Sequence, residues 1–272
     1  MKQRIVTGAL LIMMAVVLLL LPGWIMALTS FAFVAIAIWE EYHALFTAGH
    51  RIVTWPVWAV AVISIPLAYF CGQRALIPLM GGALLLVCVC VLFRKEPSLT
   101  DLSMSVLPLM TVLLPGLSIV NMSLLSPHAK EVVYLSLTLA VPLVGDMFAL
   151  FAGVMFGKKK LCPAVSPNKT VAGAIGGLAG SLVAAGIIYA VTCYVCDEPT
   201  MAILPLWWHY LILGFLGGMV GQIGDLFASL VKRHSRIKDF SNLFPGHGGM
   251  LDRLDSVLFM AVLMYSYMLI CA

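Results

Sequence analysis

Residues 224–256 read GDLFASLVKRHSRIKDFSNLFPGHGGMLDRLDS, a polar and glycine-rich segment between two strongly apolar stretches. The segment contains four of the 12 acidic residues of the chain and five of its 16 lysines and arginines. The whole chain is 62% hydrophobic and only 10% charged. Charged side chains are costly near lipid unless they are paired or bind a ligand. The contrast between this segment and its flanks therefore predicts membrane-spanning helices joined by a functional polar loop.

The apolar stretches predict an all-α polytopic membrane protein. The mean hydropathy of +1.06 excludes an ordinary soluble domain, and runs of about 17–25 apolar residues are long enough to span a bilayer as helices. Lys2 and Arg4 before the first run would also suit a signal peptide, but the run is long and lacks a clear cleavage site, which favours a retained helix. We predict about nine transmembrane helices, at residues 6–22, 25–46, 55–71, 75–93, 103–125, 132–156, 171–195, 205–231 and 254–271.

The basic residues indicate the orientation. With nine spans, 14 of the 16 lysines and arginines fall on the side of the N-terminus, and only Arg74 and Lys130 fall on the other. Cytoplasmic loops are enriched in basic residues, so we expect a cytoplasmic N-terminus. The net charge of +4 reflects this topology and does not indicate nucleic-acid binding. We predict one transmembrane domain over residues 1–272, with scaffold helices in 1–130 and catalytic helices and cytoplasmic loops in 131–272.

Small residues favour close packing of the C-terminal helices. Glycines spaced three or four apart let two helix backbones approach in lipid. The seven cysteines show no metal-binding pattern, because the CxxC of Cys193 and Cys196 has no second pair. We expect the tight packing to surround Asp146 and Asp225, and it involves Gly173, Gly176, Gly177, Gly180, Gly214, Gly217, Gly218, Gly221 and Gly224.

Acidic residues in and beside the last two spans are candidate metal ligands. Asp225 shares a helix face with Ser229 and Lys232, and Asp252 and Asp255 share a face where the ninth span begins. An aspartate in a first helical turn also interacts favourably with the helix dipole. That alternative accounts for Asp252 but not for Asp225, which lies within an apolar helix. We predict Asp225 and Asp252 as metal ligands and Asp255 as a further candidate, and oxygen-only ligands favour Mg²⁺.

Asp146 is a further intramembrane candidate ligand, and a basic loop follows its span. Residues 158–170 combine four lysines with hydroxyl side chains. We predict that Ser166, Lys169 and Thr170 bind phosphate groups. The alternative is a solvated cytoplasmic loop that only obeys the positive-inside rule.

The sequence PGHGG at residues 245–249 leads directly into the ninth span. Glycines there let backbone N–H groups approach an anion at the helix N-terminus, so Gly248 and Gly249 are candidate substrate-binding residues. His247 has three interpretations: a hydrogen bond to phosphate, a proton-transfer group, or a cap of the turn. The other five histidines are scattered and are assigned no role.

These residues together resemble a known signature. The pattern Ser229-x-x-Lys232-Arg233, Lys238-Asp239, Asn242, Phe244-Pro245, His247-Gly248-Gly249 and Asp252-Arg253-x-Asp255 is similar, without a break, to that of phosphatidate cytidylyltransferases, also called CDP-diacylglycerol synthases. The resemblance extends over roughly the whole chain, because it also includes Trp39-Glu40, Asp146, Gly153, residues 166–170 and Gly173. The length of 272 residues suits the bacterial type.

The resemblance implies a Mg²⁺-dependent enzyme of the bacterial inner membrane that joins CTP to phosphatidic acid, giving CDP-diacylglycerol and pyrophosphate. It implies a nine-helix fold, often a homodimer, with the active site on the cytoplasmic side and two cations at Asp225 and Asp252. The expected catalytic residues are Asp225, Asp252, Asp255, Lys232 and His247. The expected substrate-binding residues are Ser166, Lys169, Thr170, Ser229, Arg233, Lys238, Asp239, Gly248, Gly249 and Arg253. The expected partners are CTP, phosphatidic acid and membrane lipids.

The chain departs from the family pattern at two places. Many members carry an acid where this chain has Ala228, and many have a bulky residue followed by Glu or Gln at Val171-Ala172. Alternatives therefore stay open: CMP transfer to another lipid phosphate, a polyprenol-type lipid kinase, a non-catalytic lipid-binding relative, or a cation-coupled transporter. The charges gather on one side of the predicted membrane, which disfavours the transporter.

Overall fold

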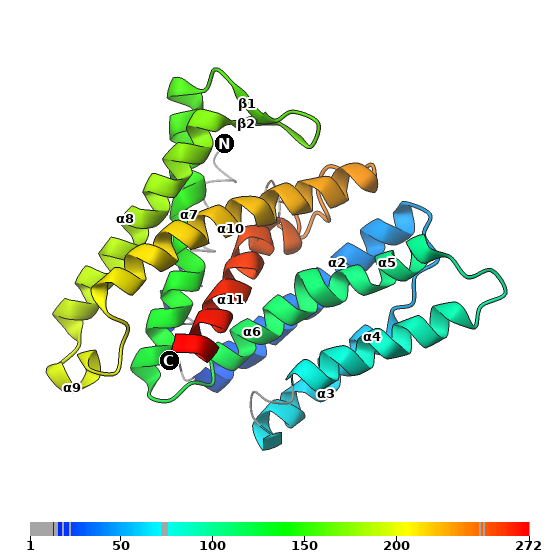
Figure 1. Cartoon of the computed structure of the whole chain (residues 1–272), viewed down its shortest axis with the longest axis horizontal. Helices are drawn as coiled ribbons and strands as arrows, with labels where there is room; N and C mark the ends of the chain where they lie inside the picture. The colour runs from blue at the N-terminus through cyan, green and yellow to red at the C-terminus, as the bar shows by residue number, and fades with distance from the viewer. Residues whose placement is uncertain are drawn as a thin grey trace.

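The computed structural model describes residues 13, 16–17, 19–21, 23–71, 76–244, 246 and 248–271. Helices dominate these residues, and a single two-stranded hairpin joins two of them (Figure 1). The elements in chain order are α2 (Gly23–Thr47), α3 (Trp55–Cys71), α4 (Leu76–Leu92), α5 (Leu99–Pro108), the π-helical turn η2 (Leu109–Leu113), α6 (Leu114–Met122), α7 (His128–Phe156), β1 (Lys160–Cys162), β2 (Ser166–Thr170), α8 (Val171–Val195), α9 (Glu198–Met201), α10 (Trp207–His234) and α11 (Leu251–Cys271).

The helix lengths confirm an α-helical membrane protein. Six helices of the described chain are long and apolar enough to cross a membrane, when α5, η2 and α6 are taken as one helix from Leu99 to Met122. The shorter apolar helices α3 and α4 have 17 residues each and coincide with the third and fourth predicted spans. The first predicted span, 6–22, lies mostly outside the described residues, so the count of nine stays a prediction. Each of the other eight ranges coincides with a helix.

Several helices extend beyond the predicted spans. Helix α7 begins at His128 rather than at 132, and α10 continues to His234 rather than ending at 231. Hydropathy detects only the lipid-exposed part of a helix, whereas the backbone hydrogen bonds continue where the helix emerges into water. The signature residues Lys232 and Arg233 therefore lie on the last turn of a rigid helix and not in a loop.

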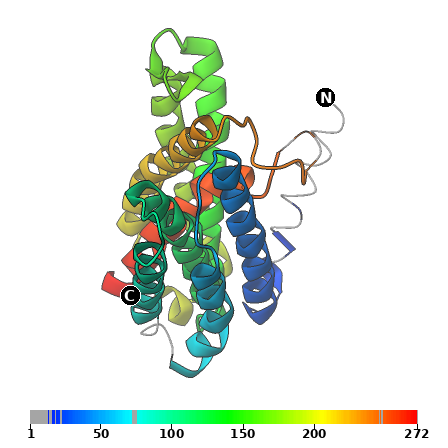
Figure 2. The same ribbon diagram turned by 90° about the vertical axis from the view of Figure 1, so that its right-hand side faces the viewer.

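The predicted basic loop at 158–170 is wrong in one respect, because much of it forms a β-hairpin. Strands β1 and β2 pair antiparallel, with Cys162 opposite Ser166 and Lys160 opposite Thr170. Prolines at 163 and 167 make the sequence look unlike a pair of strands, but proline is tolerated on an isolated edge strand. Thr170 ends the hairpin and caps α8, because its hydroxyl accepts a 3.0 Å hydrogen bond from the Gly173 N–H. Figure 2 shows the hairpin at one end of the helical bundle.

Close packing through small residues is confirmed around α8. A Cβ atom at Gly176 would lie 2.3 Å from the Ala152 Cβ of α7, and one at Gly218 would lie 2.7 Å from the Ser181 side chain. Helix α10 crosses the bundle and packs against both α8 and α11 (Figure 1). The buried core extends from α2 through α11, so both halves of the chain share it.

Candidate active site

Three carboxylates from three helices lie near one another at the hairpin end of the bundle. Asp146 comes from α7, Asp225 from α10 and Asp255 from α11, and they are close enough for their charges to interact. The Ser256 hydroxyl donates a 3.4 Å hydrogen bond to Asp146 Oδ2. Three acids in this position form a negative cluster that favours cations. We call Asp146, Asp225 and Asp255 the acidic cluster.

The hairpin brings a lysine to this cluster. Lys169 of β2 forms an ion pair with Asp225, and the two side chains are 24% and 28% exposed. The charge of Lys169 also acts on Asp146. The prediction that Lys169 and Asp225 belong to one site is consistent with this geometry, although the two residues are 56 positions apart in sequence.

Asp252 has a different environment. Its Oδ1 accepts a 2.7 Å hydrogen bond from Lys232 Nζ. Its Oδ2 accepts hydrogen bonds from the backbone N–H of Phe240 at 2.8 Å and of Gly249 at 2.9 Å. The Asp252 side chain is only 3% exposed. Both oxygens are therefore engaged in closing the loop between α10 and α11, which we call the signature loop (residues 240–251).

Glu40 of α2 is a second carboxylate on the signature loop. It is fully buried, and its Oε1 accepts hydrogen bonds from the Ser241 hydroxyl at 2.6 Å and the Met250 N–H at 2.9 Å. Its Oε2 accepts a 2.7 Å hydrogen bond from the Leu251 N–H. The sequence motif suggested Glu40 only as a point of family resemblance. The adjacent glutamates 40 and 41 in an otherwise apolar span were the available signal for its importance.

These bonds change the interpretation of the PGHGG segment. The N–H groups of residues 249–251, where we expected an anion to bind, already donate to Asp252 and Glu40. Gly248 has a φ of +82°, and a Cβ at Gly249 would lie 2.5 Å from Glu40 Oε1. The glycines thus permit two protein carboxylates to approach the backbone. Their assignment as substrate-binding residues stays a prediction.

The remaining predicted residues differ in their contacts and in their exposure. Arg233 Nε donates a 3.3 Å hydrogen bond to the Val165 carbonyl in the hairpin, and the charge of Arg253 acts on Asp146. Ser229 and Ser166 are partly buried, whereas Lys238 and Asp239 are exposed and follow the C-terminal end of α10. His247 lies outside the described residues, so its three interpretations stay open.

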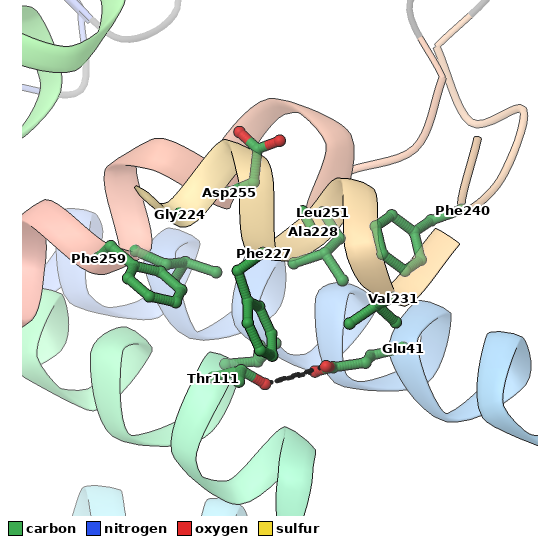
Figure 3. A pocket seen from close by; sticks show the side chains of 12 residues that line it. Glu41, Thr111, Gly224, Phe227, Ala228, Val231, Phe240, Leu251, Asp255 and Phe259 are labelled. Carbon is green, nitrogen blue, oxygen red and sulfur yellow. Dashed lines mark hydrogen bonds between the residues drawn. The ribbon is translucent and has the colours of Figure 1, made fainter. Parts of the chain in front are cut away.

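A small cavity lies between α2, η2, α10 and α11, and Asp255 of the acidic cluster is one of the residues that line it (Figure 3). It is lined mainly by apolar side chains such as Phe227, and it has room for about one water molecule. Glu41 lies in its wall and accepts hydrogen bonds of 2.8 and 3.0 Å from the Thr111 hydroxyl of η2. Ala228, where many relatives of the resembled family carry an acid, also lines this cavity. In Figure 3 the carboxylate of Asp255 points away from Glu41.

The donor set allows a test of the predicted metal site. Among the described residues, no three His, Cys, Asp or Glu side chains are arranged to surround an ion. Mg²⁺, however, commonly takes only one or two carboxylates and completes its octahedron with water and substrate phosphates. Asp225 with Asp146 or Asp255 offers such oxygen donors. The residues therefore fit a cation that shares its coordination with a bound nucleotide.

Comparison with known proteins identifies the family of the chain. The model of a family described as "Cytidylyltransferase family" matches residues 2–271. The chain belongs to the cytidylyltransferase family. Proteins named phosphatidate cytidylyltransferase are among its relatives. That of Staphylococcus saprophyticus is 30% identical over 268 residues, 97% of each chain, and that of Staphylococcus haemolyticus is 30% identical over 270 residues, also 97% of each.

A more similar but shorter match concerns part of the chain. The phosphatidate cytidylyltransferase of Bacillus subtilis is 46% identical over 121 residues, which is 44% of this chain and 41% of that protein. Within this cytidylyltransferase, the signature residues divide into two groups. Lys232, Asp252 and the glycines close the signature loop, whereas Asp225 and Asp255 belong to the acidic cluster.

Proposed function

We propose that this protein is a phosphatidate cytidylyltransferase, which transfers CMP from CTP to phosphatidic acid and releases pyrophosphate. The observation that carries the proposal is the position of the signature residues. Residues scattered over α7, β2, α10 and α11 meet at one end of a membrane-type bundle, in a chain that belongs to the cytidylyltransferase family.

The reaction needs positioning and charge neutralisation more than base catalysis. A phosphate oxygen of phosphatidic acid forms a bond to the α-phosphorus of CTP, and the bond from that phosphorus to the pyrophosphate oxygen breaks. The attacking oxygen is already anionic, so the barrier lies in bringing two anions together and stabilising the departing pyrophosphate. Basic groups at the hairpin end would supply this stabilisation: Lys169, Lys232, Arg233, Lys238 and Arg253.

We propose Mg²⁺ as the cofactor, with Asp225 as its main protein ligand and Asp146 or Asp255 as the second. A bound Mg²⁺ would neutralise phosphate charge in the transferring group. In the resembled family, the aspartate that matches Asp252 is a metal ligand. For this chain that role requires Asp252 to give up at least part of its bonding with Lys232 and the signature loop. A second cation near Asp252 is part of the same proposal.

The proposed topology has nine spans, a cytoplasmic N-terminus and a cytoplasmic active site in a bacterial inner membrane. Three of the predicted cytoplasmic loops gather at one end of the bundle, which supports this topology. His50 of the α2–α3 loop lies 2.7 Å from His234 at the end of α10, and Arg233 contacts the hairpin. Such a site is open to CTP from the cytosol and to phosphatidic acid from the bilayer. A homodimer, common in the resembled family, belongs to the proposal as well.

The test is incubation of the purified full chain with labelled CTP, phosphatidic acid and Mg²⁺, followed by chromatography of the lipids. We expect labelled CDP-diacylglycerol, and we expect Asp225→Asn to reduce its formation at least about 100-fold, since one removed charge-stabilising group commonly costs that much. The matched control is Asp197→Asn, an exposed aspartate that caps α9. No labelled lipid from the wild type would contradict the proposal. Label on an added polyprenyl phosphate instead of phosphatidic acid would favour the altered-substrate alternative.

A further inference from the structure

The signature loop is held from two sides by two carboxylates. Asp252 bonds the loop from within, through the N–H groups of Phe240 and Gly249. Glu40 bonds it from α2, through Ser241, Met250 and Leu251. The two sets of donors alternate along the same short stretch of chain. Any shift of this stretch would therefore disturb both carboxylates.

The burial of Glu40 costs free energy, and its three hydrogen bonds compensate for part of that cost. The side chain is fully buried within an apolar helix, and burial of a carboxylate is costly unless donors replace its hydration. None of the ion pairs found in the described part of the chain includes Glu40. Its partners are two backbone N–H groups at the N-terminus of α11 and one hydroxyl. The N-terminus of a helix also attracts negative charge through the helix dipole.

Two glycines of the signature loop allow the backbone to approach Glu40 closely. Gly249 lies directly against the carboxylate of Glu40, where any Cβ would collide with its oxygens at 2.5 to 2.6 Å. Gly248 has the positive φ that brings Gly249 into place. The glycines of the signature therefore fit Glu40 as closely as they fit Asp252.

We propose that Glu40 is a positioning residue: it fixes the signature loop, and through it the place of Asp252 and Lys232. Because Glu40 supplies its own cap to residues 250 and 251, the start of α11 stays anchored when Asp252 engages a cation or substrate. The kinetic part of this proposal rests on the proposed function. The structural part does not, because it concerns the substrate-free protein.

The neighbouring glutamate provides a matched control. Glu41 follows Glu40 on the same helix, and only 1% of its surface is exposed. Its carboxylate, however, bonds Thr111 of η2 and has no bond to the signature loop. Glu40→Gln and Glu41→Gln therefore make the same chemical change at adjacent buried sites. A general loosening of the fold would affect both variants, whereas a loss of loop positioning would affect only the first.

Hydrogen exchange measures the structural part directly. In Glu40→Gln the amide NH₂ group faces backbone N–H donors, so at least one donor loses its acceptor. Exchange would be followed by mass spectrometry in peptides covering residues 241–253 of the substrate-free full chain in detergent. We expect exchange there at least about tenfold faster in Glu40→Gln than in the wild type, and wild-type rates in Glu41→Gln. Unchanged exchange in Glu40→Gln, or equal acceleration in both variants, would overturn the proposal.

The Mg²⁺ dependence of CMP transfer measures the functional part. A partly unfolded preparation lowers the amount of active enzyme but cannot alter the half-saturating Mg²⁺ concentration. We expect Glu40→Gln to raise that concentration at least about fivefold, because Asp252 loses its fixed place, and Glu41→Gln to leave it unchanged. An unaltered concentration in Glu40→Gln would refute the positioning role. If the wild type itself transfers no CMP, the proposed function fails, while hydrogen exchange still decides the role of Glu40.

A milder variant covers the case in which Glu40→Gln does not insert or fold. Ser241→Ala removes one of the three donors to the same carboxylate and leaves the buried charge capped by the two backbone groups. We expect a smaller acceleration of exchange in the same peptides. Absence of any acceleration in Ser241→Ala would then count against the proposal.

Discussion

Lys169 supplies the most informative single substitution. Its ammonium group contacts Asp225 and its charge acts on Asp146, so it occupies the place beside the acidic cluster that a divalent cation would take. Replacement by methionine keeps the apolar stem and removes the charge. We expect Lys169→Met to bind a divalent cation more tightly in the absence of substrate, because the ion no longer competes with the ammonium group.

The expected gain in cation affinity follows from the exposure of the Lys169–Asp225 ion pair. Two unit charges 4 Å apart interact with about 4 kcal/mol at an effective dielectric constant of 20. Lys169 and Asp225 are each about a quarter exposed, and exposed pairs are worth no more than about 1 kcal/mol after screening. We therefore expect roughly fivefold tighter cation binding, which corresponds to about 1 kcal/mol.

Titration with Mn²⁺, followed by electron paramagnetic resonance, measures this affinity without turnover. The same variant should transfer CMP with a kcat/KM for CTP at least about tenfold lower, because a charge near the phosphates is lost. Lys160→Met is the control, since Lys160 lies on the same hairpin but is exposed and has no ion pair among the described residues. Equal or weaker Mn²⁺ binding in Lys169→Met would refute the idea that the lysine and the cation compete.

Two further substitutions test the buried acids. Lys232→Met removes the ammonium group that pairs with Asp252, whose side chain is only 3% exposed. We expect a loss of about 3–5 kcal/mol of stability and a lower thermal midpoint in detergent, and we expect Lys232→Met/Asp252→Asn to recover part of that loss. An unchanged midpoint would show that the pair is not buried in the membrane-embedded protein. Ala228→Glu adds a carboxylate near Glu41 in the one-water cavity, so we expect a lower midpoint that Glu41→Gln partly restores. If Glu41→Gln lowers the midpoint of Ala228→Glu further, the two side chains do not repel each other.

Hydrophobic periodicity and length were sufficient to place most of the helices. Helix α8 matches its predicted range, and α2, α3 and α4 match theirs within two residues, because a lipid-spanning helix needs about 20 predominantly apolar residues. The hairpin at 160–170 could not be predicted in this way. It is short and exposed and contains prolines, and it is defined by pairing of its two strands rather than by any apolar pattern.

The site was predictable as a set of residues but not as a set of contacts. Charge in an apolar chain identified Asp146, Asp225 and Asp252, since such residues require a compensating partner. The partners themselves come from tertiary structure: Glu40 bonds residues that follow it by more than 200 positions. No spacing rule connects positions so far apart. For the same reason the sequence could not distinguish a glycine that admits an anion from one that admits a protein carboxylate.

Asp252 and Asp255 illustrate how one helical turn serves two purposes. They lie three residues apart on one face of α11, so the sequence predicts the same environment for both. The signature loop folds back over the first turn and gives Asp252 two backbone donors, and Lys232 of α10 gives it a third. Asp255 accepts a hydrogen bond from the Ser256 N–H instead of from the signature loop, and it lies near Asp225 and Asp146. In the proposed enzyme, a cation would therefore meet the acidic cluster first. Asp252 would become a ligand only if Lys232 gave up its hydrogen bond, and Glu40 would then hold the signature loop in place.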